Sequence, residues 1–422
     1  MSRRSRRDLL RGTALVASGA VAGCVDTVVD SLGGGCSESA LTEGPASASG
    51  DGRWAGYGSG PENDAATSAS GPDEPELAWR YATCDTLLDR CSPLLADGRM
   101  FVSHRKDGGT RALDASTGEQ LWTSETTGPS VGQAYANGTL YAANGDLFAF
   151  DGADGSVEWQ FTPVPEEGPE EGPGDVTPNV HAPAVAEDGT VFVAAVAEAI
   201  WQFALDAVDG SRLWERRLAD SRLPFVTAVG PEAVFAVGTE TELLTLDRET
   251  GEVRWTREFE NRVAAAAVAG DRLYVTTDGV LHALSLDGRP RYTIPTGVQP
   301  WPVAADGERL YVTDRTLILA AFDAETGEKL WRAEDVSEPG KPVVGESTVY
   351  VGDVEFPDDG SPQAVIHAVD KATGDSEWQF EARGRSGEGD RRYFGTKEQI
   401  AVGDGTLYAT TGAGDLYAIA DR

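Results

Sequence analysis

Lysine, cysteine and histidine are scarce in this chain of 422 residues, and beyond its N-terminal region the sequence holds no apolar run long enough to span a membrane. There are four cysteines and four histidines, and none are spaced as metal ligands. No nucleophile elbow, metal-binding histidine pair or phosphate loop is present. These absences predict a protein without catalytic residues and without a metal site. A structural role is expected for each histidine, with metal binding as the alternative.

Basic residues are few as well. The 35 Lys and Arg side chains oppose 69 Asp and Glu, which gives a formal net charge of −34, and five of the basic residues are lysines. Such a chain lacks the basic surface that nucleic acids require, so we expect no nucleic-acid partner. An acidic, lysine-poor composition resembles that of proteins from extreme halophiles, especially archaea. Concentrated salt screens the self-repulsion there, because the Debye length falls to ~3 Å at 1 M.

What the sequence does contain is one motif, A-x-D-x-x-T-G-x-x-x-W, repeated along most of its length. Six copies cover residues 112–122, 149–159, 204–214, 245–255, 321–331 and 368–378, and a shorter copy covers 283–292. The glycine between two short apolar runs can supply the positive φ of a tight hairpin. The preceding Asp can accept hydrogen bonds from the turn amides. Each copy therefore predicts a β-hairpin.

A second hairpin precedes each motif, as in residues 267–275, where Gly270 and Asp271 separate two apolar runs. Two hairpins provide four strands in every repeat of roughly forty residues, which is typical of propeller blades. An aromatic residue ends the last strand of seven such units: Trp122, Trp159, Trp214, Trp255, Tyr292, Trp331 and Trp378. We interpret these residues as packing between blades, with a ligand-binding role as the alternative.

The chain begins an eighth unit after residue 399 and stops at Arg422 before a fourth strand. The missing strand is found near the other end, where Pro75 to Tyr81 reads as a fourth strand and carries Trp79. The sequence therefore predicts an all-β, eight-bladed propeller of four-stranded antiparallel blades, closed by an N-terminal strand that completes the C-terminal blade. Closure of this kind removes free sheet edges. We assign residues 74–422 to the propeller.

These motifs resemble the PQQ-like repeat family over about residues 75–422. The resemblance implies blades that interlock through a tryptophan-docking contact. One branch of the family comprises lipoproteins that take part in β-barrel assembly at Gram-negative outer membranes, and another comprises quinoprotein dehydrogenases that bind PQQ and calcium. The dehydrogenases carry adjacent cysteines, which this chain lacks, and they are longer. A shared fold does not imply a shared function. We therefore expect neither PQQ nor calcium as a cofactor.

The N-terminus resembles an export signal. Arg6 and Arg7 match a twin-arginine motif, a short apolar stretch follows, and Val21-Ala22-Gly23-Cys24 resembles a lipobox with lipidation of Cys24. The alternative is a basic tail without that role. We expect a signal peptide over residues 1–23, a flexible acidic, Gly/Ser-rich tether over 24–73, and a lipid-anchored protein at the outer face of the cytoplasmic membrane.

Two cysteines flank the connection from the N-terminal strand to the first blade. Cys84 and Cys91 could form a disulfide after export, or remain two thiols. Cys36 lies in the expected tether without an assigned role.

The longest insertions fall on the connections between blades and between second and third strands, which emerge on one face of a propeller. The insertion at residues 382–398 is basic and includes Arg385, Arg391, Arg392 and Tyr393. Arginines bind carboxylates and phosphates and stack on aromatic rings. These residues could contact an acidic partner, or they could clamp the acidic insertion at residues 163–178 of the same chain. We expect a non-catalytic scaffold that binds an unknown protein or ligand. The alternatives are a PQQ-dependent dehydrogenase and a polymer-processing enzyme with paired carboxylates.

Overall fold

The structure, a computed structural model, contains one compact unit that begins at Ser39 and ends at Arg422. It describes residues 40–56, 58–82, 93–103, 109–124, 132–163, 179–180, 183–196, 199–219, 226–296, 303–313, 318–337, 340–355, 363–382, 400–411 and 415–422. No helix within these ranges is long and apolar enough to cross a membrane.

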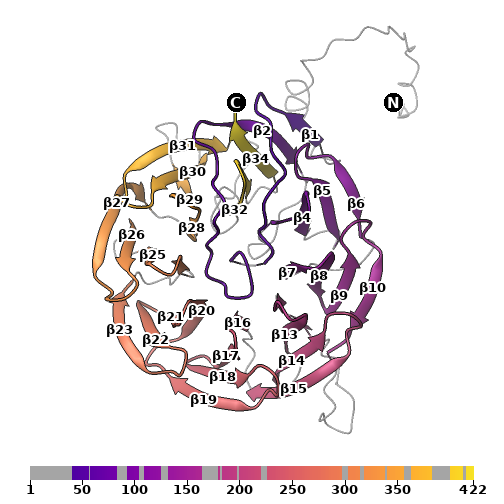
Figure 1. Cartoon of the computed structure of the whole chain (residues 1–422), viewed down its shortest axis with the longest axis vertical. Helices are drawn as coiled ribbons and strands as arrows, with labels where there is room; N and C mark the ends of the chain where they lie inside the picture. Colours follow the sequence, from indigo (N-terminus) through magenta and orange to yellow (C-terminus); the bar gives the residue numbers. More distant parts are fainter. Residues whose placement is uncertain are drawn as a thin grey trace, which may run out of the picture. The chain divides into compact units, whose positions relative to one another are not determined.

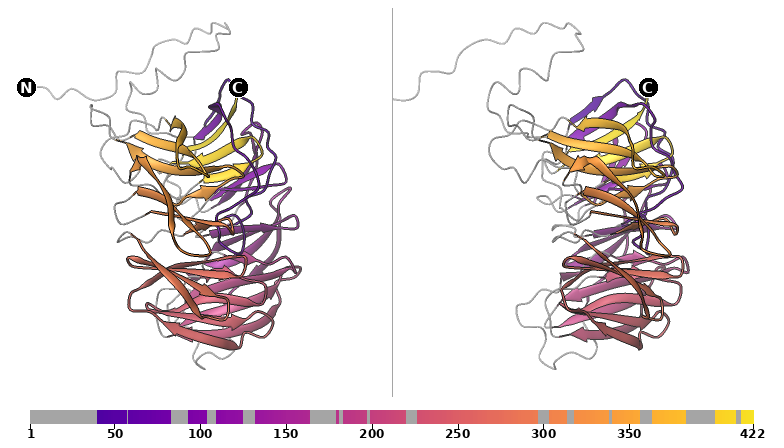
Figure 2. Two further views of the ribbon diagram at one scale, coloured as in Figure 1. Left: turned by 60° about the vertical axis from the view of Figure 1, so that its left-hand side comes forward. Right: turned by 90° about the vertical axis from the view of Figure 1, so that its left-hand side faces the viewer.

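Eight antiparallel sheets surround a central axis in this unit, with the first strand of each sheet innermost and the last outermost (Figure 1). The predicted eight-bladed propeller is therefore confirmed. Apolar side chains fill the spaces within and between neighbouring sheets, so the core is a set of clusters that follows the ring. Figure 2 shows the same ring from two sides, with the blades stacked around it as twisted sheets.

The first four blades follow each other in chain order. Blade 1 comprises β3 (Leu94–Ala96), β4 (Arg99–Ser103), β5 (Thr110–Asp114) and β6 (Gln120–Thr123). Blade 2 comprises β7 (Gly132–Ala136), β8 (Thr139–Asn144), β9 (Asp146–Asp151) and β10 (Val157–Phe161). Blade 3 comprises β11 (Asn179–Val180), β12 (Ala184–Val185), β13 (Thr190–Val196), β14 (Ile200–Asp206) and β15 (Arg212–Ala219). Blade 4 comprises β16 (Val226–Val229), β17 (Ala233–Thr239), β18 (Glu242–Asp247) and β19 (Val253–Glu258).

The next three blades repeat the pattern. Blade 5 comprises β20 (Val263–Ala269), β21 (Arg272–Thr277), β22 (Val280–Ser285) and β23 (Pro290–Pro295). Blade 6 comprises β24 (Ala304–Ala305), β25 (Arg309–Thr313), β26 (Ile318–Asp323) and β27 (Lys329–Ser337). Blade 7 comprises β28 (Val343–Val344), β29 (Thr348–Glu355), β30 (Gln363–Asp370) and β31 (Ser376–Ala382).

Blade 8 joins the two ends of the chain. Its inner strands are β32 (Ile400–Gly403), β33 (Thr406–Thr410) and β34 (Asp415–Asp421), and its fourth strand is β2 (Pro75–Ala82). Leu77 pairs with Ile419 and Tyr81 pairs with Leu416, so the predicted closure by an N-terminal strand is confirmed. A further strand, β1 (Ala40–Glu43), pairs with the outer edge of β2 and gives this blade five strands. The sequence analysis did not predict β1.

The repeated motif forms the outer hairpin of a blade. In blade 1 the Asp114 carboxylate accepts hydrogen bonds from the Ser116 and Thr117 amides, both at 2.9 Å, and Gly118 completes the turn with φ +74°. The alanine of the motif lies opposite the tryptophan across the last two strands, as Ala112 does with Trp122. A register shift next to this pair recurs in the blades. The small residue and the bulge together leave room for a large ring to lie over the strand.

Candidate functional site

The eight aromatic residues assigned to blade packing lie on the outer strands, and each donates a hydrogen bond to a backbone carbonyl further along the ring. Seven tryptophan indoles make this bond at distances between 2.9 and 3.2 Å, and the Tyr292 hydroxyl makes it at 2.6 Å. The pairs are Trp79–Ala115, Trp122–Gly152, Trp159–Ala207, Trp214–Arg248, Trp255–Leu286, Tyr292–Ala324, Trp331–Lys371 and Trp378–Pro72. These contacts fasten each blade to the next.

The pair Trp378–Pro72 differs from the others, because its acceptor belongs to the segment before β2. Blade 8 has no continuous outer hairpin, since its third and fourth strands come from opposite ends of the chain. Pro72 supplies the carbonyl that a hairpin turn supplies in the other blades. The segment before β2 thus replaces a missing part of the repeat.

This segment, residues 44–73, is hereafter the central segment; it runs into the middle of the ring and returns to β2 (Figure 1). The sequence analysis expected residues 24–73 to be a flexible tether, and for residues 40–73 the structure corrects that expectation. Trp54 is 1% exposed and Ala65 is fully buried. The physical reason is that the inner strands present unpaired backbone groups to the axis, and the central segment pairs with them.

The central segment makes one circuit of the ring. At one equivalent position in six blades, the inner strand donates its amide to a carbonyl of the segment at 2.8–2.9 Å. The donor and acceptor pairs are Leu95–Trp54, Tyr135–Ala55, Val229–Pro61, Val268–Glu62, Ala305–Asp64 and Val344–Ala65. In blade 8 the Asp404 amide donates a hydrogen bond to the Asp51 carbonyl, and the Gly405 amide donates one to the Ser70 carbonyl. The segment therefore reaches seven of the eight blades through backbone bonds between described residues.

The stretch from Gly58 to Ala65 holds an unusual concentration of left-handed backbone. Ser59, Asn63 and Ala65 have φ values of +74°, +58° and +54°. Such conformations are costly for residues other than glycine, and they persist where the surroundings impose them. Here the Asn63 side chain donates to the Ala266 carbonyl at 2.9 Å and accepts from the buried Lys341 ammonium at 3.1 Å. These two contacts hold Asn63 against blades 5 and 7.

Two acids in this stretch have raised pKa values. Burial raises the pKa of Asp64 to about 6, against the hydrogen bond from the Ser59 hydroxyl at 3.0 Å, which lowers it. Burial also raises the pKa of Glu62, and the negative charge of Glu187 contributes to that rise. Both carboxylates are therefore held in surroundings that disfavour their charge.

Replacing Asp64 by asparagine is expected to stabilise the protein near pH 7 and to change little near pH 4. The folded-state pKa of about 6 exceeds the ordinary value of 3.8. The folded protein therefore keeps a proton between these pH values that the unfolded chain has lost, and stability falls as the pH rises through this window, by on the order of 2 kcal/mol. Asparagine cannot ionise, and it retains an oxygen that can accept from Ser59. Urea unfolding of wild type and Asp64→Asn at both pH values measures the difference.

The matched control is Asp335→Asn, because Asp335 is exposed on β27. This variant is expected to differ little from wild type at either pH. An Asp64→Asn effect of equal size at both pH values would contradict the assignment of the raised pKa to burial of Asp64.

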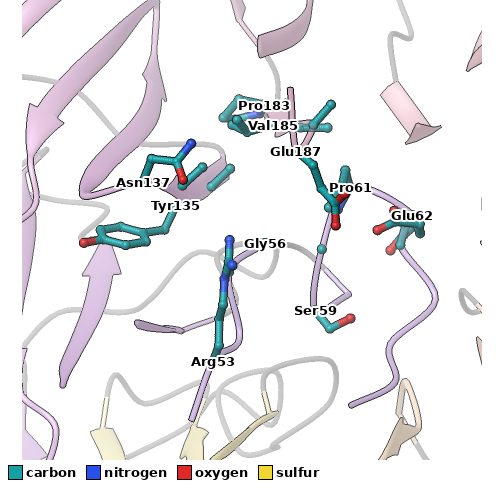
Figure 3. Close-up of a pocket in the computed structure, with 17 residues that line it drawn as sticks. Arg53, Gly56, Ser59, Pro61, Glu62, Tyr135, Asn137, Pro183, Val185 and Glu187 are labelled. Carbon is teal, nitrogen blue, oxygen red and sulfur yellow. The ribbon is translucent and has the colours of Figure 1, made fainter. Parts of the chain in front are cut away.

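A cavity of about 290 Å³ lies between the central segment and the inner strands of blades 2 and 3. Figure 3 shows the Arg53 side chain rising into it, with Tyr135 and Asn137 on one side and Pro61 and Glu187 on the other. Pro183 and Val185 close the far end. Every lining residue belongs to the central segment, to β7 or β12, or to the residues that directly flank these two strands. The cavity adjoins blade 3, for which no backbone bond to the central segment is found among the described residues.

Elsewhere, polar side chains are buried near the ends of the middle strands. Asp353 and His367 lie on the neighbouring strands β29 and β30 of blade 7, with 3.7 Å between carboxylate oxygen and ring nitrogen, and both are nearly fully buried. His282 is half-buried in blade 5, where burial lowers its pKa. Within the described ranges no three His, Cys, Asp or Glu side chains gather as a metal ion would require.

Several residues singled out from the sequence lie outside the described residues. They are the export arginines Arg6 and Arg7, the lipid attachment site Cys24, the cysteines Cys84 and Cys91, and the residues of the basic insertion, Arg385, Arg391, Arg392 and Tyr393. The sequence analysis missed the cavity. One signal could have indicated that the central segment packs into the ring, because Trp54 is a large aromatic residue outside the repeat register and within a Gly/Ser-rich run.

The known proteins that this chain resembles include BamB proteins and quinoprotein dehydrogenases. A protein of *Nitrosomonas eutropha* named outer membrane protein assembly factor BamB is 29% identical over 42% of this chain and 41% of its own length. The protein of that name from *Burkholderia pseudomallei* is 25% identical over 62% of this chain and 70% of its own. The quinoprotein ethanol dehydrogenase of *Pseudomonas aeruginosa* is 27% identical over 46% of this chain and 30% of its own. The chain thus spans less than half of the first and third of these relatives.

Solved structures that resemble this chain include proteins of both groups. BamB from *Moraxella catarrhalis* superimposes with a TM-score of 0.55 at 18% identity and covers 79% of this chain and 97% of its own. The quinohemoprotein alcohol dehydrogenase of *Comamonas testosteroni* gives a TM-score of 0.64 at 14% identity, over 87% of this chain and 80% of its own. At these identities the likeness concerns the fold.

The family model described as outer membrane protein assembly factor BamB matches residues 29–219, 202–297 and 293–422. These matches together cover the whole described unit and all eight blades. The chain therefore belongs to this BamB-like family of PQQ-repeat propellers.

Proposed function

We propose that this protein is a non-catalytic scaffold, anchored by a lipid at the outer face of the cytoplasmic membrane, that holds another protein. The observation that carries the proposal is the filled centre of the ring. The central segment makes backbone hydrogen bonds with the inner strands of six blades and with the turn that follows the inner strand of blade 8, and it buries Trp54. A ring fastened through eight aromatic contacts and filled by its own chain is a rigid platform. Binding residues concentrate on loops held by such a platform.

Anchoring rests on the sequence. Arg6 and Arg7 would direct export, and Cys24 would carry the lipid. One acyl chain binds a membrane only weakly, so a stable anchor would need a second chain. The acidic, lysine-poor composition supports the proposal that the protein functions in a cell that maintains concentrated salt. In a haloarchaeal cell the client would differ from that of a Gram-negative outer-membrane factor.

The contact for the partner is proposed at residues 382–398. Arg385, Arg391 and Arg392 give this insertion a positive charge within a chain of net charge −34. Guanidinium groups pair with carboxylates in a two-pronged geometry, and the neighbouring Tyr393 adds a flat apolar surface. An acidic protein surface would match these groups. The competing role is a clamp onto the acidic residues between 163 and 178.

A PQQ-dependent dehydrogenase is the second candidate, because similarity to the *Pseudomonas aeruginosa* enzyme extends over 46% of this chain. Bound PQQ would supply two-electron oxidation of an alcohol. The match covers 30% of that enzyme, and this chain has no adjacent cysteines of the kind that the resemblance to the dehydrogenases implies. Reduction of a redox dye by the purified protein with PQQ, calcium and an alcohol would favour this candidate over the scaffold.

Affinity capture from native membranes tests the scaffold. The full-length protein is expressed in its own cells, solubilised in concentrated salt and captured with its bound proteins. We expect a partner that is recovered reproducibly with wild type and lost, by tenfold or more, when Arg385, Arg391 and Arg392 are all replaced by glutamine. The binding free energy lost would be on the order of that of one or two charge-assisted hydrogen bonds.

The matched control replaces three arginines of blades 4 and 5 by glutamine, namely Arg254, Arg262 and Arg289. Their side chains are 37%, 46% and 84% exposed. This variant carries the same change of charge and should retain the partner. If both variants capture the partner equally well, the basic insertion is an internal clamp. If neither wild type nor any variant captures a partner, the scaffold proposal is contradicted.

A further inference from the structure

At one position in the backbone circuit, the inner strand has no partner among the described residues. This position is Val185 in blade 3. Val185 pairs with the second residue of the strand that follows it, and so does the donor residue of the inner strand in each of the six bonded blades. Those donor residues are Leu95, Tyr135, Val229, Val268, Ala305 and Val344. The Ala186 amide donates to the Thr190 carbonyl within the blade. Antiparallel pairing alternates, so the Val185 amide and carbonyl face the axis of the ring. Among the described residues, nothing accepts from this amide.

The cavity of about 290 Å³ adjoins this amide. It exists because the central segment turns away after Gly56 and next bonds to a blade at Pro61, whose carbonyl accepts from Val229 in blade 4. The turn is held by the Ala55 amide, which donates to the Ser59 carbonyl at 3.0 Å, and by the left-handed Ser59. The left-handed conformation of Ser59 costs conformational energy, which a direct path along blade 3 would avoid. The detour leaves the edge of β12 without a neighbouring strand from the described part of the central segment.

The charges around the cavity have opposite signs at two places. Arg53 extends into the cavity, its side chain is exposed, and it makes no ion pair with any described residue (Figure 3). Glu62 and Glu187 line the cavity from the central segment and from the end of blade 3. They are close enough for the charge of Glu187 to raise the pKa of Glu62. A cation placed between these carboxylates would relieve their repulsion.

We propose that this cavity binds the carboxyl-terminal end of an extended peptide that also carries a positive charge. The terminal carboxylate pairs with the Arg53 guanidinium, a peptide carbonyl accepts from the Val185 amide, and a lysine or arginine side chain lies against Glu62 and Glu187. The central segment makes the same backbone bond in six other blades, so an extended chain is the natural occupant. The volume is near the lower limit of small-ligand sites, roughly 300 Å³, and admits only a few residues.

The site lies at the turns between the first and second strands, where Asn137 and Glu187 are found. The basic insertion 382–398 joins a fourth strand to a first strand, as the order of the described strands requires. The two regions involve different connections of the blades. The proposed peptide site therefore does not depend on the scaffold function or on its arginine-rich contact.

Titration calorimetry with four acetylated tripeptides tests the proposal on the full-length protein at one salt concentration. The probes are Ac-Lys-Ala-Ala and Ac-norleucine-Ala-Ala, each with a free or an amidated carboxyl terminus. We expect the lysine peptide with the free carboxylate to bind, and its amide to bind roughly 10- to 100-fold more weakly. Hydrogen exchange should slow at the Val185 amide when this peptide is bound.

Two variants locate the groups. Arg53→Gln should abolish the preference for the free carboxylate, and Glu187→Gln should reduce the preference for lysine over norleucine. The control is Arg289→Gln, since Arg289 is 84% exposed on another blade and should leave binding unchanged. Attaching Lys-Ala-Ala to the carboxyl terminus of a folded carrier protein distinguishes protein tails from free peptides. Binding of either form supports the site.

Three results would overturn the proposal. They are the absence of binding by any probe at millimolar concentration, equal binding of free and amidated peptides to wild type, and an unchanged carboxylate preference in Arg53→Gln. Binding without protection of the Val185 amide would overturn the backbone contact and with it the assignment to an extended peptide.

Discussion

Replacing Trp54 by alanine is expected to lower the free energy of unfolding by about 3–5 kcal/mol. Trp54 is 1% exposed in the core cluster that joins blades 1, 6, 7 and 8 to the central segment. Its backbone exchanges two hydrogen bonds with Leu95, at 2.7 and 2.9 Å. Removing the indole leaves a large void at the start of the circuit, so amides such as those of Leu95 and Tyr135 should exchange faster. Urea unfolding and hydrogen exchange measure the two effects.

The control variant is Trp54→Phe. The indole N–H is buried and donates to none of the described residues, so phenylalanine removes an unsatisfied donor while it retains most of the apolar surface. We expect this variant to lie within about 1 kcal/mol of wild type. If Trp54→Ala were as stable as Trp54→Phe, the central segment would contribute little to the ring.

Replacing Gly251 by alanine is expected to cost about 2–4 kcal/mol. Gly251 has φ +69°, and a Cβ atom there would lie 2.6 Å from the Trp214 ring. The left-handed backbone contributes on the order of 1 kcal/mol. The remainder comes from displacing the Trp214 ring, which loses its 2.9 Å hydrogen bond to the Arg248 carbonyl. Urea unfolding followed by circular dichroism provides the measurement.

Gly98→Ala is the matched control, because Gly98 has φ +71° and nothing lies within 4 Å of the position of its Cβ. It should cost only about 1 kcal/mol, from the backbone alone. The difference between the two variants isolates the docking of one blade on the next. Equal losses would mean that the tryptophan contact contributes nothing measurable beyond backbone strain.

The number of blades and their closure could be predicted because each signal is local and repeated. A glycine with positive φ, an aspartate that caps a turn and an aromatic residue at the end of a strand all act within about ten residues of chain. Pro75 to Tyr81 could be recognised as a fourth strand because it keeps the aromatic residue of that strand, Trp79. Its place in the C-terminal blade could be predicted because the eighth unit stops at Arg422 before a fourth strand.

The candidate site could not be predicted in the same way. Residues 44–73 have the composition of a linker, with many glycines, serines and alanines. Their attachment to the ring depends mainly on backbone carbonyls, such as those of Pro61 and Glu62, which every residue type possesses. No side-chain pattern therefore distinguishes this segment from a solvated tether, apart from the isolated Trp54.

By itself the sequence determined that this is an eight-bladed ring joined through its two ends, because repeated motifs specify hairpins and hairpins of equal length specify blades. Tertiary structure alone decided that the chain before β2 fills the centre of the ring and leaves Val185 beside an open cavity. That outcome depends on where eight inner strands present their unpaired amides, and these positions exist only once the ring has closed.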